Sequence, residues 1–307
     1  MIRKAVIPIA GLGTRFFPAS HAYKKEFFPV VAPDGIARPL LHYQIMNLLD
    51  AGIAQICIIV RSGEEKLVVD YFQGPDEAYR ARLESSPQLL GEVERMREAL
   101  ERITFAVQAT QEGFGHAVYA SRVFANGEPI LLCLGDHLFR GKRESCHVRL
   151  MRAFERCGGK TVSAVNRIRV AELKGYGTIA GKRLANAPEL IEVTRIIEKP
   201  SIEIAREQLR VDGLGDDEFL GWFGMHALAP SIFDVLAEMI ARDIRHKGEF
   251  QLTHAQELQR AREGYFALEM IEGTRFDFGT PQDFAASIVE FAGEEMKDKF
   301  FHRSSFG

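Results

Sequence analysis

Short apolar segments alternate with segments of helical periodicity through the first half of the chain. Residues 5–9 and 54–60 have the continuous apolar pattern of buried strands, and residues 40–51 between them place apolar side chains at helical spacing. Two buried strands joined by a helix are typical of a βαβ unit with a parallel strand pair. The same patterns predict further strands at 103–107, 130–134 and 161–165, and helices at 116–123 and 146–155.

This alternation predicts a doubly wound α/β sheet with helices on both faces. After Gly177 the pattern changes, because segments of strand character follow one another with fewer helices between them. We expect strands at 178–180, 191–197 and 219–227, and helices at 231–241, 252–262 and 283–299. A Rossmann-like mixed sheet with a small inserted lobe fits this order, and ligands of such sheets bind beyond the carboxyl ends of the strands.

Residues 76–102 form a charged segment between the second and third predicted strands. Its apolar members recur at regular spacing and are Leu83, Leu89, Leu90, Val93, Met96 and Leu100. This regularity favours a solvated helical pair laid on the sheet over an interaction tail. The last predicted helix carries Phe284, Ile288 and Phe291 on one face. That face fits packing on the protein's own sheet as well as it fits a subunit contact.

Composition and charge exclude several classes of protein. With 46% hydrophobic residues, 26% charged residues and a net charge of −3, the chain has a globular composition and lacks the basic excess of a general nucleic-acid binder. No run approaches the ~18 apolar residues of a membrane-spanning helix, and the N-terminus has no signal-peptide pattern. The four cysteines have neither Cys-x-x-Cys nor zinc-ligand spacing. We therefore expect a cytoplasmic protein without nucleic-acid or membrane partners.

The strongest chemical signal follows the first predicted strand. Residues 10–15 read Ala-Gly-Leu-Gly-Thr-Arg, and residues 24–29 read Lys-Lys-Glu-Phe-Phe-Pro. Glycines allow a backbone to approach a phosphate closely, and the cations can neutralise a polyphosphate. The segment is not a P-loop, because no Gly-Lys-Ser/Thr follows, and Phe16 stands where the dinucleotide fingerprint needs its third glycine. The pattern predicts a phosphate-binding loop of another kind.

These residues resemble the signature loop of the sugar-1-phosphate nucleotidylyltransferases, and the similarity continues along nearly the whole chain. It is strongest toward the bacterial UTP–glucose-1-phosphate uridylyltransferases. The other matching motifs, in family order, are Gln108, Gly-Phe-Gly-His-Ala-Val at 113–118, Leu-Gly-Asp at 134–136, Tyr-Gly at 176–177, Glu-Lys-Pro at 198–200, Glu-Phe-Gln-Leu-Thr at 249–253 and Asp-Phe-Gly at 277–279. The insertion at 76–102 favours a uridylyltransferase over a thymidylyltransferase. Lys24 and Gly135 replace family prolines and residues 34–38 lengthen a loop, which leaves base and sugar open.

The resemblance and the chemistry together assign catalytic and metal-binding roles. Nucleotidyl transfer brings an anionic sugar-phosphate oxygen to an anionic α-phosphorus, so cations must offset the repulsion. Arg15 and Lys25 are expected to bind the triphosphate and stabilise the leaving pyrophosphate, and Lys199 to align the sugar phosphate. Asp136, at a strand end, would hold Mg²⁺ between the substrates, and the family implies Asp277 as its second ligand. Either aspartate could instead cap a helix or turn.

The resemblance also implies the binding pockets. The nucleotide-binding residues are expected to be Ala10, Gly11, Gly13, Thr14, Gln108 and Gly113. Gln108 offers the donor and the acceptor that match a pyrimidine ring. Glu198 would accept hydrogen bonds from two sugar hydroxyls, and Gly177 would let the backbone approach the sugar. His116 is interpreted as a packed or capping residue, and Lys24, Arg38 and Lys174 as solvated charges.

The implied activity is the formation of UDP-glucose and pyrophosphate from UTP and α-D-glucose 1-phosphate, by a Mg²⁺-dependent homo-oligomer. A thymidylyltransferase or another member of the family is the alternative. A glycosyltransferase is disfavoured because Asp136-His137-Leu138 lacks the usual Asp-x-Asp, and an inactive nucleotide-sugar-binding regulatory protein because Arg15, Lys25 and Asp136 are all present. We expect one nucleotidyltransferase domain over 1–307, divided into a nucleotide-binding half (1–140), a sugar-phosphate-binding half (141–282) and a C-terminal helix and tail (283–307).

Overall fold

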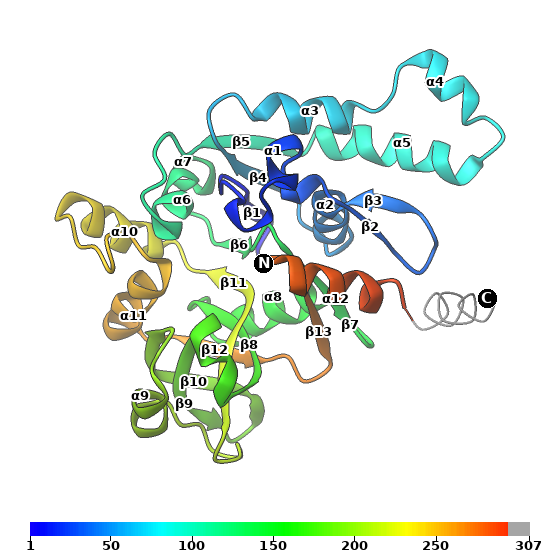
Figure 1. The fold of residues 1–307 in the computed structure, drawn as a ribbon. Coiled ribbons are helices and arrows are strands. Elements are labelled where there is room, and N and C mark those ends of the chain that lie inside the picture. Colours follow the sequence, from blue (N-terminus) through cyan, green and yellow to red (C-terminus); the bar gives the residue numbers. More distant parts are fainter. Residues whose placement is uncertain (294–307) are drawn as a thin grey trace.

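A mixed sheet of nine strands forms the centre of the protein, in the order β5-β4-β1-β6-β11-β8-β12-β10-β9. The computed structural model describes residues 1–293 (Figure 1). The four strands at the beginning of this sheet order are parallel, which confirms the prediction for this half of the chain. They are β1 (Lys4–Pro8), β4 (Gln55–Val60), β5 (Ile103–Val107) and β6 (Ile130–Cys133).

The second half of the sheet is mixed, as predicted. Strand β11 (Glu218–Leu228) pairs antiparallel with β6 and with β8 (Val162–Arg169). Beyond β8 lie β12 (Phe266–Glu269), β10 (Ala187–Glu198) and β9 (Gly177–Leu184). Because β11 also pairs with β9, the sheet curls back on itself and forms the lobe at the bottom of Figure 1. Strand β12, only four residues long, was missing from the sequence prediction.

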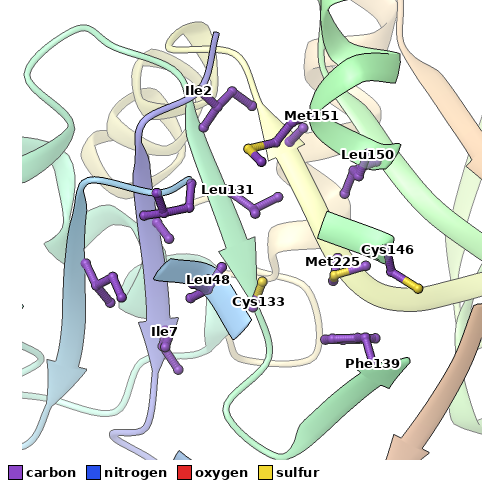
Figure 2. Close-up of a cluster of buried hydrophobic side chains, with 14 of the residues drawn as sticks. Ile2, Ile7, Leu48, Leu131, Cys133, Phe139, Cys146, Leu150, Met151 and Met225 are labelled. Carbon is purple, nitrogen blue, oxygen red and sulfur yellow. The ribbon is translucent and has the colours of Figure 1, made fainter. Parts of the chain in front are cut away.

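Helices cover both faces of the sheet, and the alternation of side chains along each strand supplies two cores. On one face, the odd-numbered residues of β1 and β6 share a core cluster with residues of α2 (Leu40–Asp50), α3 (Glu65–Gln73) and α8 (Cys146–Arg156). Figure 2 shows Ile7, Leu48, Leu131 and Cys133 in this cluster. On the other face lie α6 (Phe114–Ala120), α10 (Ser231–Ala241) and α11 (Leu252–Glu263). The predicted helix at 116–123 is in fact α6 followed by the short α7 (Arg122–Ala125).

The charged insertion is a helical pair, α4 (Glu77–Arg82) and α5 (Pro87–Leu100), that projects from the body in Figure 1. Helix α5 packs mainly on α3 and α2. The expected helical pair is therefore present, but only the C-terminal part of α5, through Ala99, reaches the core on this face of the sheet. Of its residues only Val93 and Ala99 are buried, because other helices already cover this face of the sheet.

Two small antiparallel pairs flank the large sheet. Strands β2 (Pro29–Val31) and β3 (Ala37–Pro39) form a hairpin around the lengthened loop, and β7 (His137–Gly141) pairs with β13 (Gly273–Asp277). Helix α12 (Pro281–Phe291) packs its predicted apolar face on this region, inside the same chain. Residues 294–299 of the predicted last helix lie outside the described residues. The remaining helices are α1 (Ala19–Ala22), α9 (Ile202–Gln208) and short 3₁₀ helices at Thr14–Phe16, Lys25–Phe27 and Val170–Gly175.

All four cysteines fall in the described part of the chain and are free thiols. Within residues 1–293, none of the helices has the length and apolar character needed to cross a membrane.

Candidate active site

The predicted phosphate-binding loop, residues 10–15 and called the phosphate loop below, leaves the carboxyl end of β1. Ala10 is buried, whereas Gly11 is exposed and faces open space, since a Cβ there would have no neighbour within 4 Å. Gly13 has a φ of +65° and leads into the 3₁₀ helix that begins at Thr14. Thr14 and Arg15 are exposed on that helix. The loop thus presents backbone and one guanidinium to solvent, as a phosphate cradle requires.

Lys25 and Asp136 form an ion pair beyond the carboxyl ends of β1 and β6, two central strands. Lys25 Nζ lies 2.6 Å from Asp136 Oδ2, and the two side chains are 16% and 22% exposed. Burial opposes the charge on Lys25, but Asp136 and Glu26 outweigh it and raise the lysine's pKa. The structure therefore brings a predicted triphosphate-binding cation against the predicted metal ligand, although the two are far apart in sequence.

His137 lies between the two predicted metal ligands. Its Nδ1 is 2.8 Å from Asp136 Oδ1 and its Nε2 is 3.3 Å from Asp277 Oδ2, because the β7–β13 pairing sets Asp277 opposite His137. Burial alone would lower the pKa of His137, but the two carboxylates outweigh it and raise that pKa to about 9. Sequence reasoning gave His137 no role; its position next to Asp136 was the only available signal.

Both aspartates are ionised at neutral pH. Burial opposes the charge on Asp136, yet His137 and Lys25 hold its pKa far below the usual range. Burial also opposes ionisation of Asp277, and its hydrogen bond to His137 outweighs that effect and lowers the pKa.

The two aspartates converge at Gly279. A Cβ added to Gly279 would lie 3.0 Å from Asp277 Oδ1 and 3.1 Å from Asp136 Oδ2. Ionised carboxylates at one point fit Mg²⁺, which takes one or two carboxylates and completes its shell with phosphate oxygens and water. Among the described residues, no three His, Cys, Asp or Glu side chains form a metal-binding cluster. Asp136 and Asp277 therefore fit a metal ion that obtains the rest of its coordination shell from phosphate oxygens and water.

Gln108 and Gly113, two predicted nucleotide-binding residues, meet beyond the carboxyl end of β5. Gln108 follows β5, is 4% exposed, and donates from Nε2 to Gly113 O at 3.2 Å. Gly113 packs closely on the chain before α11, because a Cβ on it would lie 2.8 Å from Phe250 O. His116 Nδ1 lies 3.1 Å from Thr110 O, which agrees with its interpretation as a packed or capping residue.

Gly177 and Glu198 meet in the lobe, where they are direct partners in the β9–β10 pairing. A Cβ on Gly177 would collide with Trp222 Nε1 and lie 2.9 Å from Glu198 Oε2, so only glycine fits. Thr253 donates from Oγ1 to Glu198 Oε2 at 2.7 Å. Trp222 Nε1 is buried without a hydrogen-bond partner among the described residues. The contacts of Trp222 and Thr253 with this pair could not be read from the sequence.

Lys199 follows β10 with a φ of +46°. Its side chain is 46% exposed, with Nζ 3.8 Å from Glu198 Oε1. Lys199 and Arg15 are thus both accessible to an anion from solvent, whereas Lys25 is already held by Asp136.

Two residues interpreted as solvated charges are in fact buried ion-pair partners. The Lys24 side chain is 8% exposed and its Nζ lies 2.5 Å from Glu64 Oε2. The Arg38 side chain is 9% exposed and donates twice to Glu92, at 2.7 Å each. The interpretation failed because each carboxylate comes from a distant part of the sequence. A hollow of about 200 Å³ beside the phosphate loop is lined by Gly11, Gly13, Lys24, Lys25, Arg61 and Glu64, among others.

Comparison with known proteins gives this fold a family. Residues 4–292 match the model of the family described as Nucleotidyl transferase. The UTP–glucose-1-phosphate uridylyltransferase 2 of Staphylococcus saprophyticus is 32% identical over 98% of this chain and 94% of its own length. The UTP–glucose-1-phosphate uridylyltransferase of Bacillus subtilis is 32% identical over 97% and 92%.

Solved structures share the fold. An apo UDP-glucose pyrophosphorylase superposes with a TM-score of 0.79 at 24% identity, covering 95% of this chain and 98% of the other. A UTP-bound UGPase from Acinetobacter baumannii superposes with a TM-score of 0.78 at 24% identity, covering 98% of this chain and 99% of the other. The family model spans nearly the whole chain, and relatives above 30% identity are matched over almost their full length. The chain belongs to the nucleotidyl transferase family.

Proposed function

We propose that the protein transfers a uridylyl group from UTP to α-D-glucose 1-phosphate and releases pyrophosphate. The observation that carries this is the convergence of Lys25, Asp136 and Asp277 beyond the carboxyl end of β1, where the phosphate loop begins. The relatives matched over nearly full length are named for the same activity. The phosphate oxygen of the sugar attacks the α-phosphorus, the bond to the β-phosphate breaks, and the electron pair leaves with pyrophosphate.

In this proposal Arg15 and Lys25 both neutralise phosphate charge, but they differ in how accessible they are. Arg15 is exposed and accessible to the triphosphate, while Lys25 is held by Asp136 until a phosphate competes for its ammonium group. His137 lies between Asp136 and Asp277, within 2.8 and 3.3 Å of their carboxylate oxygens, and restricts the orientation of both side chains. We propose Mg²⁺ as the ion held by these two carboxylates, where it would neutralise phosphate charge.

The lobe supplies the sugar subsite in this proposal. Glu198 accepts hydrogen bonds from sugar hydroxyls, Gly177 leaves room for the ring, and Lys199 contacts the sugar phosphate. Gln108 and the main chain at Gly113 bind the uracil. Accordingly, we propose residues 1–140 as the nucleotide-binding half and 141–282 as the sugar-phosphate-binding half. We also propose a homo-oligomer in the cytoplasm, where free thiols are typical.

Pyrophosphate exchange tests the reaction. Labelled pyrophosphate and UDP-glucose should yield labelled UTP only if the enzyme is a pyrophosphorylase. No exchange at any Mg²⁺ concentration would favour the inactive nucleotide-sugar-binding alternative.

Competition among nucleotides tests the base. A uracil methyl group is worth only about 1–3 kcal/mol in discrimination, whereas a site that hydrogen-bonds the ribose 2′-OH rejects deoxyribose more strongly. The turnover rate with UTP should therefore be much higher than with dUTP and modestly higher than with 5-methyl-UTP. ATP and GTP should be nearly inert. A dTTP rate equal to that of UTP would assign the protein to the thymidylyltransferases instead.

A further inference from the structure

The carboxylate of Glu198 is anchored on one of its two oxygens. Thr253, the second residue of α11, is 9% exposed and donates from Oγ1 to Glu198 Oε2 at 2.7 Å. The other oxygen, Oε1, faces Lys199 Nζ at 3.8 Å, and the Glu198 side chain is 23% exposed. Because Thr253 fixes Oε2, the rotation of the carboxylate is restricted and Oε1 is left for another partner.

Helix α11 is itself fixed along the strand that carries Glu198. Glu257, one turn after Thr253, accepts at Oε2 from the backbone N–H of Ile196 on β10 at 2.9 Å. Arg260 holds Glu257 in place through two hydrogen bonds of 2.8 and 2.9 Å. The Thr253 hydroxyl is therefore held in register with Glu198 by a second contact between α11 and β10.

The chain just before α11 is held by backbone hydrogen bonds to residues 112–115, at the start of α6. Phe250 donates its N–H to Glu112 O at 2.9 Å and accepts at its carbonyl from Gly115 N–H at 2.7 Å. Gly113, between them, has no room for a Cβ against Phe250. The start of α11, and Thr253 with it, is therefore also held from this side by backbone hydrogen bonds.

We propose that Thr253 is a positioning residue that orients Glu198 toward the sugar. The inference rests on the proposed sugar-binding role of Glu198.

The test replaces the hydroxyl and keeps the volume. Thr253→Val should raise the KM for glucose 1-phosphate about tenfold, the typical effect of losing a hydrogen bond to a charged group, and change kcat and the KM for UTP less than about twofold. Thr253→Ser should restore the KM. Thr104→Val, a matched change on β5 away from the site, should leave all constants unchanged. If Thr253→Val does not fold, Thr253→Cys, a weaker donor, replaces it with the same expectation.

A double variant separates this inference from the proposed function. Glu198→Gln should raise the KM for glucose 1-phosphate, and Thr253→Val should add less than about twofold in that background. An unchanged KM in Glu198→Gln would refute the sugar-binding role itself. A raised KM in Glu198→Gln but not in Thr253→Val, or a full tenfold addition in the double variant, would refute the positioning role alone.

Discussion

At the scale of single residues, Asp136 stands out because two cationic groups hold one carboxylate. Asp136→Asn keeps the size of the side chain and removes the charge, so the fold should persist while Mg²⁺ binding fails. We expect turnover to fall by an amount equivalent to several kcal/mol of transition-state stabilisation. Initial rates across a Mg²⁺ series would measure it, with circular dichroism as the control for folding. Near-normal activity at limiting Mg²⁺ would contradict the metal assignment.

Lys25 gives a second prediction at this scale. Lys25→Met removes the ammonium group and leaves Asp136 with His137 alone. Turnover should fall on the order of 10²-fold, as for the loss of one preorganised donor to a developing anion. Lys66→Met is the matched control, since the Lys66 side chain is 79% exposed. A loss below tenfold in Lys25→Met would mean that Lys25 does not contact the leaving group.

At this scale, the sequence points to a residue when its signal lies in its own sequence neighbourhood, and not when its contacts come from distant segments. Asp136, Asp277 and Gln108 could be proposed as site residues because they stand in recognisable motifs, two of them just after an apolar strand. His137 and Thr253 acquire their contacts only when β7 meets β13 and α11 meets β10. No spacing rule links such residues, so only the folded structure brings them together.

At the scale of elements, the Arg38–Glu92 pair joins the β2–β3 hairpin to α5. Arg38→Met would leave Glu92 partly buried without its main partner, and breaking a buried pair on one side costs about 3–5 kcal/mol. Urea unfolding should show a loss of that order. The control is Arg95→Gln, which breaks an exposed pair with Asp50 worth about 0–1 kcal/mol. Equal losses in both variants would refute a special role for Arg38.

The sequence predicted elements correctly where an apolar pattern repeats over a long segment. It missed short strands that form only because they pair with a neighbouring strand. Helix α10 was placed at its observed bounds, since its apolar face repeats over three turns. The four residues of β12 and the three of β2 are too short to display a period. They become strands because a neighbouring strand supplies hydrogen bonds, which is information from elsewhere in the chain.

At the scale of the whole molecule, a buried polar cluster makes stability depend on pH. His226 is 3% exposed, with Nδ1 2.5 Å from Ser163 Oγ and 3.1 Å from Gln256 Nε2. Burial lowers its pKa to about 3. Between an ordinary pKa near 6.5 and that value, the unfolded chain binds a proton that the folded chain does not, so stability falls as the pH falls.

The expected size is about 1.4 kcal/mol per pH unit below 6.5 for this one group. The free energy of unfolding from urea titrations at pH 7 and 5.5 should therefore drop less in His226→Gln, by about 1 kcal/mol, than in the native protein. His21→Gln, at an exposed histidine, should leave the drop unchanged. An identical drop in His226→Gln would show that other groups alone cause the acid sensitivity.

Strand β11 ties the two sides of the sheet together, and this has a consequence during biosynthesis. Strand β6 is completed at residue 133, yet one of its two partners, β11, ends only at residue 228. Strand β8 waits for both of its partners, β11 and β12. At 5–20 residues per second, a nascent chain exposes these apolar, unpaired edges for on the order of ten seconds. A chain whose synthesis stops in this interval should be prone to aggregate, because these strands remain unpaired. A chaperone that binds the nascent chain would protect it most during the same interval.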